Sequence, residues 1–333
     1  MSAPAPSMFS AEAQQTAARL GLKMGRPNLE VFADALLELA RADRNVITVT
    51  SDSRGSGKLT AFGQALPNQI VEMGIAEQNL VGVAAGLASA GKNVFAVSPA
   101  CFLTARALEQ IKNDVAYSDN PVTLVGISAG VSYGALGTTH HSLHDFAALR
   151  AVNNLTIIAP ADNFETRAAV EFAAAAQQPV YLRFGKAPLY DLPASEFVCG
   201  RARVVREGTD VAFIASGETV IHAMLAAQWL AEQHGIQSRV LSMATIKPLD
   251  AAAVLACANE CRAVITVEEH MVYGGLGEAC AGVIAQSGSG IRFKFAGIPD
   301  EYTVTGSQAD IFRHYGISME GLVETALKLM TLE

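Results

Sequence analysis

Short apolar runs alternate along the chain with longer stretches in which apolar positions recur at helical spacing. The run at 45–50, Asn-Val-Ile-Thr-Val-Thr, is apolar or β-branched at nearly every position. Strands buried on both faces of a parallel sheet have this composition. A helix start is indicated at Asp162, a good N-cap with Glu165 three residues later. We therefore expect strands at 45–50, 69–73, 93–97, 121–127, 155–159 and 179–184, with helices at 103–116 and after Asp162.

A change in composition divides this pattern in two. Pro188, Pro193 and mixed polar residues mark 188–200 as a linker. Beyond it we expect strands at 210–215, 237–241, 263–267 and 291–295, helices at 218–234 and 251–259, a glycine-rich turn at 273–277 that opens a helix, and two terminal helices. Such alternation predicts βαβ units. The chain is thus expected to be an α/β protein with two domains, each a mostly parallel sheet flanked by helices. The expected segments are a flexible N-terminal segment at 1–23, domains at 24–187 and 201–333, and the linker between them.

Composition and charge narrow the classes of function. Half of the 333 residues are hydrophobic, 17% are charged, and the formal net charge is −8, so a nucleic-acid backbone would be repelled and no nucleic acid is expected as a partner. The longest apolar stretch, 80–102, contains glycines, Lys92 and Pro99, and therefore does not predict a membrane span. Residues 1–7 lack the pattern of a signal peptide. The five cysteines form no CxxC pair, which indicates reduced thiols in a cytoplasmic protein.

A carboxylate follows directly on the second expected strand. Residues 72–80 read Glu-Met-Gly-Ile-Ala-Glu-Gln-Asn-Leu, so that a strand ends, Gly74 turns the chain, and a helix opens with Glu77 in its first turn. An acid at this place is typical of helix starts, where it interacts with the helix dipole. The loops beyond the carboxyl ends of parallel strands are also where such folds bind ligands. Glu77 is therefore a candidate for either role.

Three of the seven histidines lie within five residues. His140, His141 and His144 fall in the loop at 134–145, for which metal ligation, acid–base catalysis and a plain surface loop are the alternatives. Adjacent histidines in a short loop tend to point apart, and no cysteine or carboxylate motif completes a ligand set, so we expect no metal ligands in this chain. An imidazole that titrates near neutrality suits proton transfer. Acid–base catalysis and a surface loop both stay open from the residues alone.

Several motifs, in the right order, resemble the transketolase family. Gly74 to Asn79 is similar to the family's pyrimidine-binding motif, and Gly137 to Asp145 matches its Gly-x-x-His stretch in register. Three stretches resemble the family's C-terminal domain: 245–250, 266–270 and 274–278. The resemblance runs from about Leu29 to the C-terminus. It implies that the first expected domain is a thiamine diphosphate pyrimidine-binding domain and that the second is a transketolase C-terminal domain.

The resemblance implies roles for three of these residues. In the family, the glutamate at the position of Glu77 hydrogen-bonds N1′ of the aminopyrimidine of thiamine diphosphate and shifts that ring toward its imino tautomer. The position of His140 faces the cofactor and the hydroxyls of the substrate, where an imidazole can transfer protons. His141 lies next to it on the substrate side. The implied reaction is transfer of a two-carbon ketol unit between sugar phosphates.

The diphosphate half of the implied cofactor site is missing from this sequence. Full-length members have an earlier domain in which Gly-Asp-Gly and a later Asn bind the diphosphate through Mg²⁺, and no such motif is present here. The resemblance therefore implies a split transketolase. In it, this chain is the β-type subunit, an N-terminal partner subunit holds the diphosphate and Mg²⁺, and the two form an α2β2 assembly.

The substrate-side positions depart from the family pattern. Ser128 stands where a histidine is usual, and Ala135 and Leu136 replace a Glu-Asp pair whose aspartate reads a sugar hydroxyl. Lys186 replaces an arginine that grips the sugar phosphate, which keeps the charge and loses the bidentate fork. Together these changes predict a non-standard substrate, such as a branched or substituted sugar phosphate.

The positions around the cofactor depart as well. The aromatic residues that clasp the pyrimidine in the family become Ala100 and Leu103, with Phe102 between them, so Phe102 and Leu103 are the candidate cofactor contacts. Two other functions remain as alternatives. One is the β subunit of a 2-oxoacid dehydrogenase decarboxylase, which has the same two-domain architecture, and the other is a non-catalytic scaffold subunit. The Gly-Thr-Thr-His-His loop favours transketolase over the first.

Overall fold

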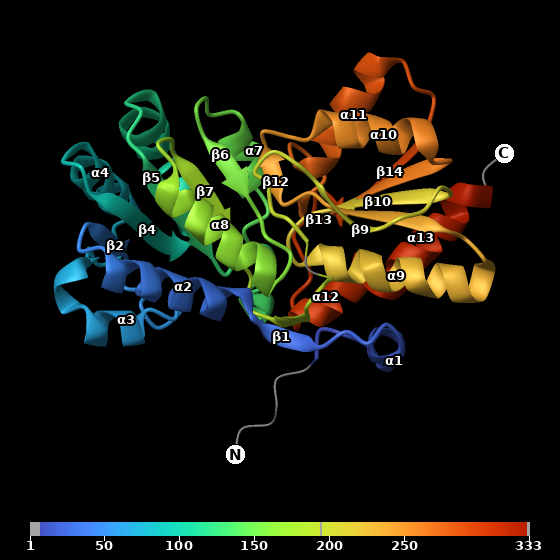
Figure 1. Ribbon diagram of the computed structural model, residues 1–333, viewed down its shortest axis with the longest axis horizontal. Coiled ribbons are helices and arrows are strands. Elements are labelled where there is room, and N and C mark those ends of the chain that lie inside the picture. The colour runs from blue at the N-terminus through green and yellow to red at the C-terminus, as the bar shows by residue number, and fades with distance from the viewer. Residues whose placement is uncertain (1–6, 194, 332–333) are drawn as a thin grey trace.

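Two α/β domains lie side by side in the computed structural model, which describes residues 7–193 and 195–331 (Figure 1). The fold class expected from the sequence is confirmed. Three parts of the expected segments lie outside the described residues: 1–6 of the N-terminal segment, 194 of the linker, and 332–333 of the second domain.

The larger sheet has seven strands in the order β12-β6-β7-β5-β4-β2-β3. Six are parallel, and β12 pairs antiparallel with β6 at the edge. The strands are β2 (Val46–Thr50), β3 (Ile70–Glu72), β4 (Asn93–Pro99), β5 (Val122–Ile127), β6 (Thr156–Ile158), β7 (Val180–Arg183) and β12 (Thr245–Lys247). Side chains alternate between the two faces of a strand, and in β4 Val94 and Ala96 join one core cluster while Phe95 and Val97 join another. Both faces of this sheet are therefore covered.

Helices on the two faces of the larger sheet complete the first domain. Helices α2 (Asn28–Ala42) and α8 (Asn163–Ala175) pack against each other on one face. The opposite face carries α4 (Glu77–Ser89), α5 (Ala100–Arg106) and α7 (Asp145–Arg150). The single helix expected at 103–116 is instead α5, a short α6 (Leu108–Gln110) and a π-helical turn, η2 (Ile111–Tyr117). Helix α3 (Thr60–Ala65) and the 3-10 turn η1 (Pro67–Gln69) connect β2 to β3.

The second domain is built on a five-stranded sheet of order β14-β13-β10-β11-β9, parallel except for β9. Its strands are β9 (Arg203–Arg206), β10 (Val211–Ala215), β11 (Ser238–Ser242), β13 (Ala263–Met271) and β14 (Arg292–Ile298). Its helices are α9 (Thr219–His234), α10 (Ala251–Glu260), α11 (Leu276–Ser287), α12 (Gln308–His314) and α13 (Met319–Thr331). Helices α9 and α13 pack together, as do α10 and α11.

The segment expected to be flexible contains a helix. Helix α1 (Ala11–Arg19) is capped by Ser10, whose hydroxyl accepts the Ala13 N–H at 3.0 Å, and it packs on α9. Ala13 and Ala17 are buried, and Arg19 forms an ion pair with Glu232 of α9 at 2.9 Å. The expectation of flexibility is therefore wrong for these residues. The physical reason is that a stripe of small alanines gives too weak an apolar signal in sequence, although a neighbouring helix can cover it.

Two short pairings connect parts of the chain that the expected boundaries separate. Strand β8 (Pro188–Tyr190), inside the expected linker, pairs antiparallel with β1 (Met24–Pro27). Strand β12, inside the expected second domain, completes the sheet of the first domain. The exact domain boundaries stay a prediction, but a strand from the second half of the sequence belongs to the sheet of the first domain.

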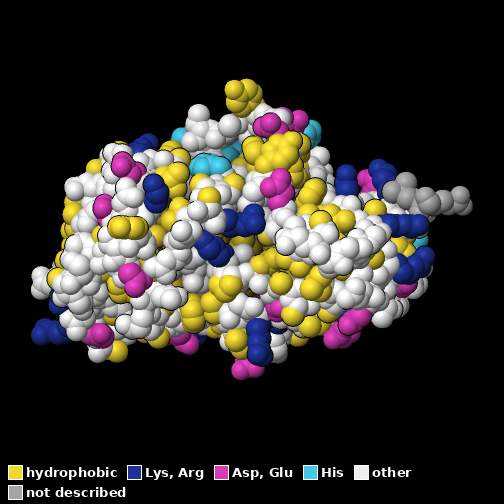
Figure 2. All heavy atoms as spheres, turned by 90° about the horizontal axis from the view of Figure 1, so that it is seen from above, with side chains coloured by type: hydrophobic (Ala, Val, Ile, Leu, Met, Phe, Trp, Pro, Cys, Tyr) yellow, Lys and Arg dark blue, Asp and Glu magenta, His cyan; other side chains and the backbone are white. Residues whose placement is uncertain are grey.

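On the face shown in Figure 2, lysine and arginine side chains are scattered in small groups among neutral, acidic and hydrophobic ones. Among the described residues, none of the helices has the length and apolar character needed to cross a bilayer.

Candidate active site

The candidate residues gather where neighbouring parallel strands end. Glu77 opens α4 after β3, Phe102 lies in α5 after β4, His140 lies in the loop after β5, and Lys186 follows β7. Strands β7, β5 and β4 are adjacent in the sheet, so their carboxyl ends lie at one edge. This edge is where open parallel sheets bind ligands.

Glu77 is a buried carboxylate held at a helix start. The chain turns at Gly74, whose φ of +67° favours glycine, and Glu77 then begins α4 with 1% of its surface exposed. One carboxylate oxygen forms an ion pair with Arg106 of α5, whose side chain is 45% exposed. A buried charge requires such a partner. Because the arginine approaches from the solvent side, it can move without disturbing the core.

A continuous line of side-chain contacts joins Glu77 to Lys186. The guanidinium of Arg106 lies 5.0 Å from the centre of the Phe102 ring. The rings of Phe102 and His140 meet edge to face at 5.3 Å, and those of His140 and Tyr133 do the same at 5.3 Å. The Lys186 Nζ then lies 3.7 Å from the centre of the Tyr133 ring. Residues from four separate segments therefore form one site.

The two adjacent histidines have different environments. His140 is half-buried, its Nδ1 is 3.0 Å from the Thr139 hydroxyl, and its Nε2 has no hydrogen bond to any described residue. His141 is buried, with Nδ1 2.7 Å from the Thr303 hydroxyl and Nε2 3.0 Å from the Gly134 carbonyl. Burial lowers the pKa of His141 below its usual value. His140 thus has one ring nitrogen without a partner among the described residues, whereas both ring nitrogens of His141 are bonded.

The other expected site residues are placed in different ways. Leu103 is fully buried in the core, whereas Phe102 beside it is half-buried and faces the site. Leu136 is 55% exposed in the 3-10 turn η3 (Gly134–Leu136), on the loop that carries His140. Ser128 is fully buried, and its Oγ has no hydrogen-bond partner among the described residues. The φ of Ser128 is +54°, a left-handed conformation that costs on the order of 1–3 kcal/mol for a non-glycine residue and is found at functional sites.

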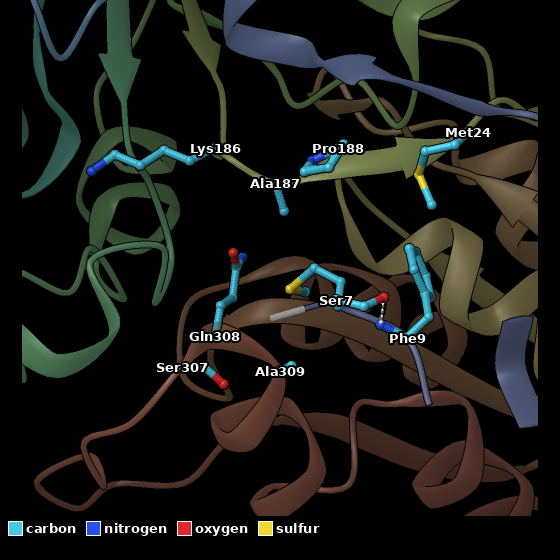
Figure 3. A pocket seen from close by; sticks show the side chains of 10 residues that line it. Ser7, Phe9, Met24, Lys186, Ala187, Pro188, Ser307, Gln308 and Ala309 are labelled. Carbon is cyan, nitrogen blue, oxygen red and sulfur yellow. Dashed lines mark hydrogen bonds between the residues drawn. The ribbon is translucent and has the colours of Figure 1, made fainter. Parts of the chain in front are cut away.

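Lys186 points into the site and away from a neighbouring cavity. A cavity of about 290 Å³ lies between Lys186–Pro188 and Ser307–Ala309, with Phe9 and Met24 also in its lining. Figure 3 shows the Lys186 side chain extending away from the other lining residues, while the Gln308 amide points into the space between the two segments. Burial lowers the pKa of Lys186 and raises that of Tyr133.

Arg106 and Tyr133 are members of the site that the sequence analysis did not single out. Arg106 lies four residues after Phe102 on α5, which places the two on the same helix face. This spacing of four residues could have indicated from the sequence that Arg106 lies beside Phe102. Tyr133 lies in an irregular loop and offered none.

The comparisons with known proteins agree with this arrangement. A family model described as "Transketolase, pyrimidine binding domain" matches residues 27–190, and one described as "Transketolase, C-terminal domain" matches 200–322. The chain belongs to the transketolase family. The resemblance inferred from the motifs is thereby confirmed.

Individual transketolases resemble this chain over most of its length. It is 48% identical over 302 residues to a subunit of the apulose-4-phosphate transketolase of Phocaeicola vulgatus, covering 90% of this chain and 96% of that one. It is 34% identical over 299 residues to a 6-deoxy-6-sulfo-D-fructose transketolase subunit of a Clostridium species, covering 89% and 92%. The solved structure of an inactive β4 tetramer of a split-gene transketolase matches with a TM-score of 0.82 and 35% identity, covering 92% and 99%. These findings support a transketolase β-type subunit over a 2-oxoacid dehydrogenase subunit and a scaffold.

Membership of the transketolase family implies dependence on thiamine diphosphate, and the residues present fit the pyrimidine half of that cofactor. Glu77 offers a buried carboxylate with one oxygen bonded to a movable arginine, and Phe102 offers an aromatic surface beside it. For the diphosphate half, no group of three or more His, Cys, Asp or Glu side chains that could hold a metal ion is found within 7–193 and 195–331.

Proposed function

We propose that this chain is the β-type subunit of a heteromeric transketolase that acts on a ketose phosphate other than the usual ones, such as the apulose 4-phosphate named for one of its relatives. The observation that carries the proposal is the contact line from Glu77 to Lys186, combined with a loop at 134–137 that has no carboxylate. The aspartate that reads a sugar hydroxyl in the family is replaced there by the apolar Leu136. A sugar whose hydroxyls are placed differently from those of the usual substrates would fit the apolar surface of Leu136 better.

The chain's own residues would act in three ways. When bound, thiamine diphosphate would supply a nucleophilic carbon. Glu77 would share a proton with N1′ of the pyrimidine, and Phe102 would offer an aromatic surface to that ring. His140 receives a proton from a substrate hydroxyl at its free Nε2 and returns it. Lys186 provides the positive charge for the substrate phosphate.

The assembly is part of the same proposal. A separate N-terminal subunit holds the diphosphate and Mg²⁺, and two of each chain form an α2β2 tetramer, with the active site between unlike subunits. This is supported by the relatives that are themselves named as separate subunits and that this chain matches over 96% and 92% of their length. The five cysteines are all free, which supports a cytoplasmic location.

A donor and acceptor panel tests the substrate. The chain is co-purified with a separate subunit that carries the Gly-Asp-Gly motif, and ketol transfer is followed with apulose 4-phosphate, 6-deoxy-6-sulfofructose, fructose 6-phosphate and xylulose 5-phosphate. We expect apulose 4-phosphate with glyceraldehyde 3-phosphate to give the highest kcat/KM. Full activity on the ordinary pair, xylulose 5-phosphate with ribose 5-phosphate, together with none on the first two sugars, would refute the substrate assignment and leave the subunit assignment intact.

A further inference from the structure

Backbone hydrogen bonds close the base of the loop that carries His140, two of them within the first domain and one, from the Met271 N–H of β13 to the Leu143 carbonyl at 3.1 Å, from the second. The Ser142 N–H donates to the Gly130 carbonyl at 2.8 Å in an isolated antiparallel bridge, and the Ala129 N–H donates to the Phe184 carbonyl at 3.0 Å. These bonds fix where the loop leaves and rejoins the sheet. They do not fix its outer part, 131–141, which contains both Tyr133 and His140.

The outer part of the loop is held from the second domain by Thr303. This residue lies between β14 and α12 and is 7% exposed. Its hydroxyl is 2.7 Å from Nδ1 of His141 and 3.1 Å from the hydroxyl of Thr138. Thr303 therefore bonds to one residue before His140, Thr138, and to one residue after it, His141.

The directions of these hydrogen bonds follow from one acceptor. The Gly134 carbonyl can only accept, so Nε2 of His141 carries the proton on that side. Nδ1 of the neutral ring is then an acceptor, and the Thr303 hydroxyl must donate to it. The Thr303 oxygen in turn accepts from the Thr138 hydroxyl. Three hydrogen bonds thus run from Thr138 to Thr303, from Thr303 to His141, and from His141 to the Gly134 carbonyl. The first two involve the Thr303 hydroxyl, and the third involves the His141 ring to which that hydroxyl donates.

Glu269 makes a second contact with the same loop. Its Oε1 accepts the Val131 N–H at 2.8 Å and the Gln308 side-chain amide at 2.8 Å, and the residue is 2% exposed. A Cβ at Gly130 would collide with the Glu269 carboxyl group, and a Cβ at Gly134 would lie 2.6 Å from the Gly306 carbonyl oxygen. The loop backbone therefore presses against the second domain at places where only glycine fits.

We propose that the second domain is a positioning element of the active site, and that Thr303 and Glu269 hold the loop so that His140 faces the substrate. The proposal rests on the proposed function of His140. His140 itself makes one side-chain hydrogen bond, to the residue before it, so its orientation depends on the backbone of its loop. Edge-to-face ring contacts with Phe102 and Tyr133 are less directional than hydrogen bonds, so the hydrogen bonds of His141 fix the backbone that carries His140 more closely than these ring contacts do.

A hydroxyl-specific variant series tests the role of Thr303. Thr303→Val removes the hydroxyl at nearly constant shape, Thr303→Ser keeps it, and Thr305→Val makes the same change at an exposed threonine two residues away. In the reconstituted assembly we expect Thr303→Val to lower kcat by about 10- to 100-fold with little change in KM, the scale set by a displacement of about 1 Å at a reacting group. Thr303→Ser and Thr305→Val should stay close to the wild type. Equal losses in Thr303→Ser and Thr303→Val, or no loss in either, would overturn the proposal.

Two further measurements keep the outcome decisive. If Thr303→Val does not assemble, Thr138→Val at the exposed end of the same chain of bonds should lower kcat in the same direction by a smaller factor. Amide hydrogen exchange over 131–141 needs no activity, and it should be faster in Thr303→Val than in Thr305→Val. If the wild-type assembly transfers no ketol unit from any sugar of the panel, the proposed function fails, and the exchange measurement still decides whether the second domain holds the loop. Unchanged exchange would refute that contact.

Discussion

Replacing Glu218 by glutamine should make the chain more stable at neutral pH, and increasingly so as the pH rises. Glu218 precedes α9, is 5% exposed, and accepts the Gln308 amide at 2.9 Å through Oε2, while its Oε1 has no hydrogen-bond partner among the described residues. Burial, reinforced by the charge of Glu269, raises the pKa of Glu218 to about 8, and Arg183 opposes this shift. Burial also raises the pKa of Glu269 to about 7.

The sign and size follow from proton binding. The folded chain holds a proton on Glu218 that the unfolded chain releases near pH 4.5, so this group lowers stability as the pH rises from about 4.5 to about 8. Each pH unit in that window changes the free energy of unfolding by ~1.4 kcal/mol. Between pH 5.5 and pH 7.5 the wild type should therefore lose roughly 2–3 kcal/mol that a glutamine variant keeps.

Urea unfolding at pH 5.5, 6.5 and 7.5 measures this effect as the difference between variant and wild type, which cancels the titration of the buried histidines. Glu171→Gln, at an exposed position of α8, is the matched control. If the difference between Glu218→Gln and the wild type is the same at all three pH values, Glu218 is ionised in the folded chain at neutral pH and the reasoning fails.

Three other expectations concern the active site and the thiols. Glu77→Gln should lower kcat of the reconstituted assembly by roughly 10²- to 10⁴-fold, the usual contribution of a positioned acid, and full retention of ketol transfer would favour the scaffold interpretation. Lys186→Met should raise KM for phosphorylated sugars by about 10-fold or more, whereas Lys186→Arg should not, as steady-state kinetics would show. Burial raises the pKa of Cys199 as well as those of Cys257, to about 12, and Cys101, to about 11, but Cys199 is half-buried whereas the other two are buried. Iodoacetamide at pH 8 should therefore modify Cys199 before these two, and mass spectrometry that found Cys257 or Cys101 labelled earlier in the folded chain would contradict this.

The fold was largely predictable from sequence because buried parallel strands have a strong signal. The apolar runs at 46–50 and 122–127 are strands, and the N-cap at Asp162 is present, with its side chain accepting the Glu165 N–H at 2.9 Å. What the sequence could not indicate was pairing between distant short segments. Three residues such as 245–247 carry no usable period, and their membership in a sheet is decided by a partner about ninety positions away.

The sequence motifs identified only part of the candidate site. Glu77 and His140 lie on the same contact line, as a shared edge of the sheet requires. The sequence could not separate Phe102 from Leu103, because the rotation of a short helix decides which of the two side chains enters the core. It also could not indicate that His141 bonds to Thr303, since no local pattern links residues of different domains.

Strand β12 lies in the second half of the sequence but belongs to the sheet of the first domain, and this limits where the polypeptide can be divided. A fragment that stopped near residue 200 would lack β12, would leave β6 with an unpaired edge, and would uncover Ile157, which shares one apolar core with Ile246. Such a fragment should aggregate. If the first half were fused to another protein, that protein would have to supply a strand in place of residues 245–247. Recombination in this family is therefore expected to exchange the two halves together.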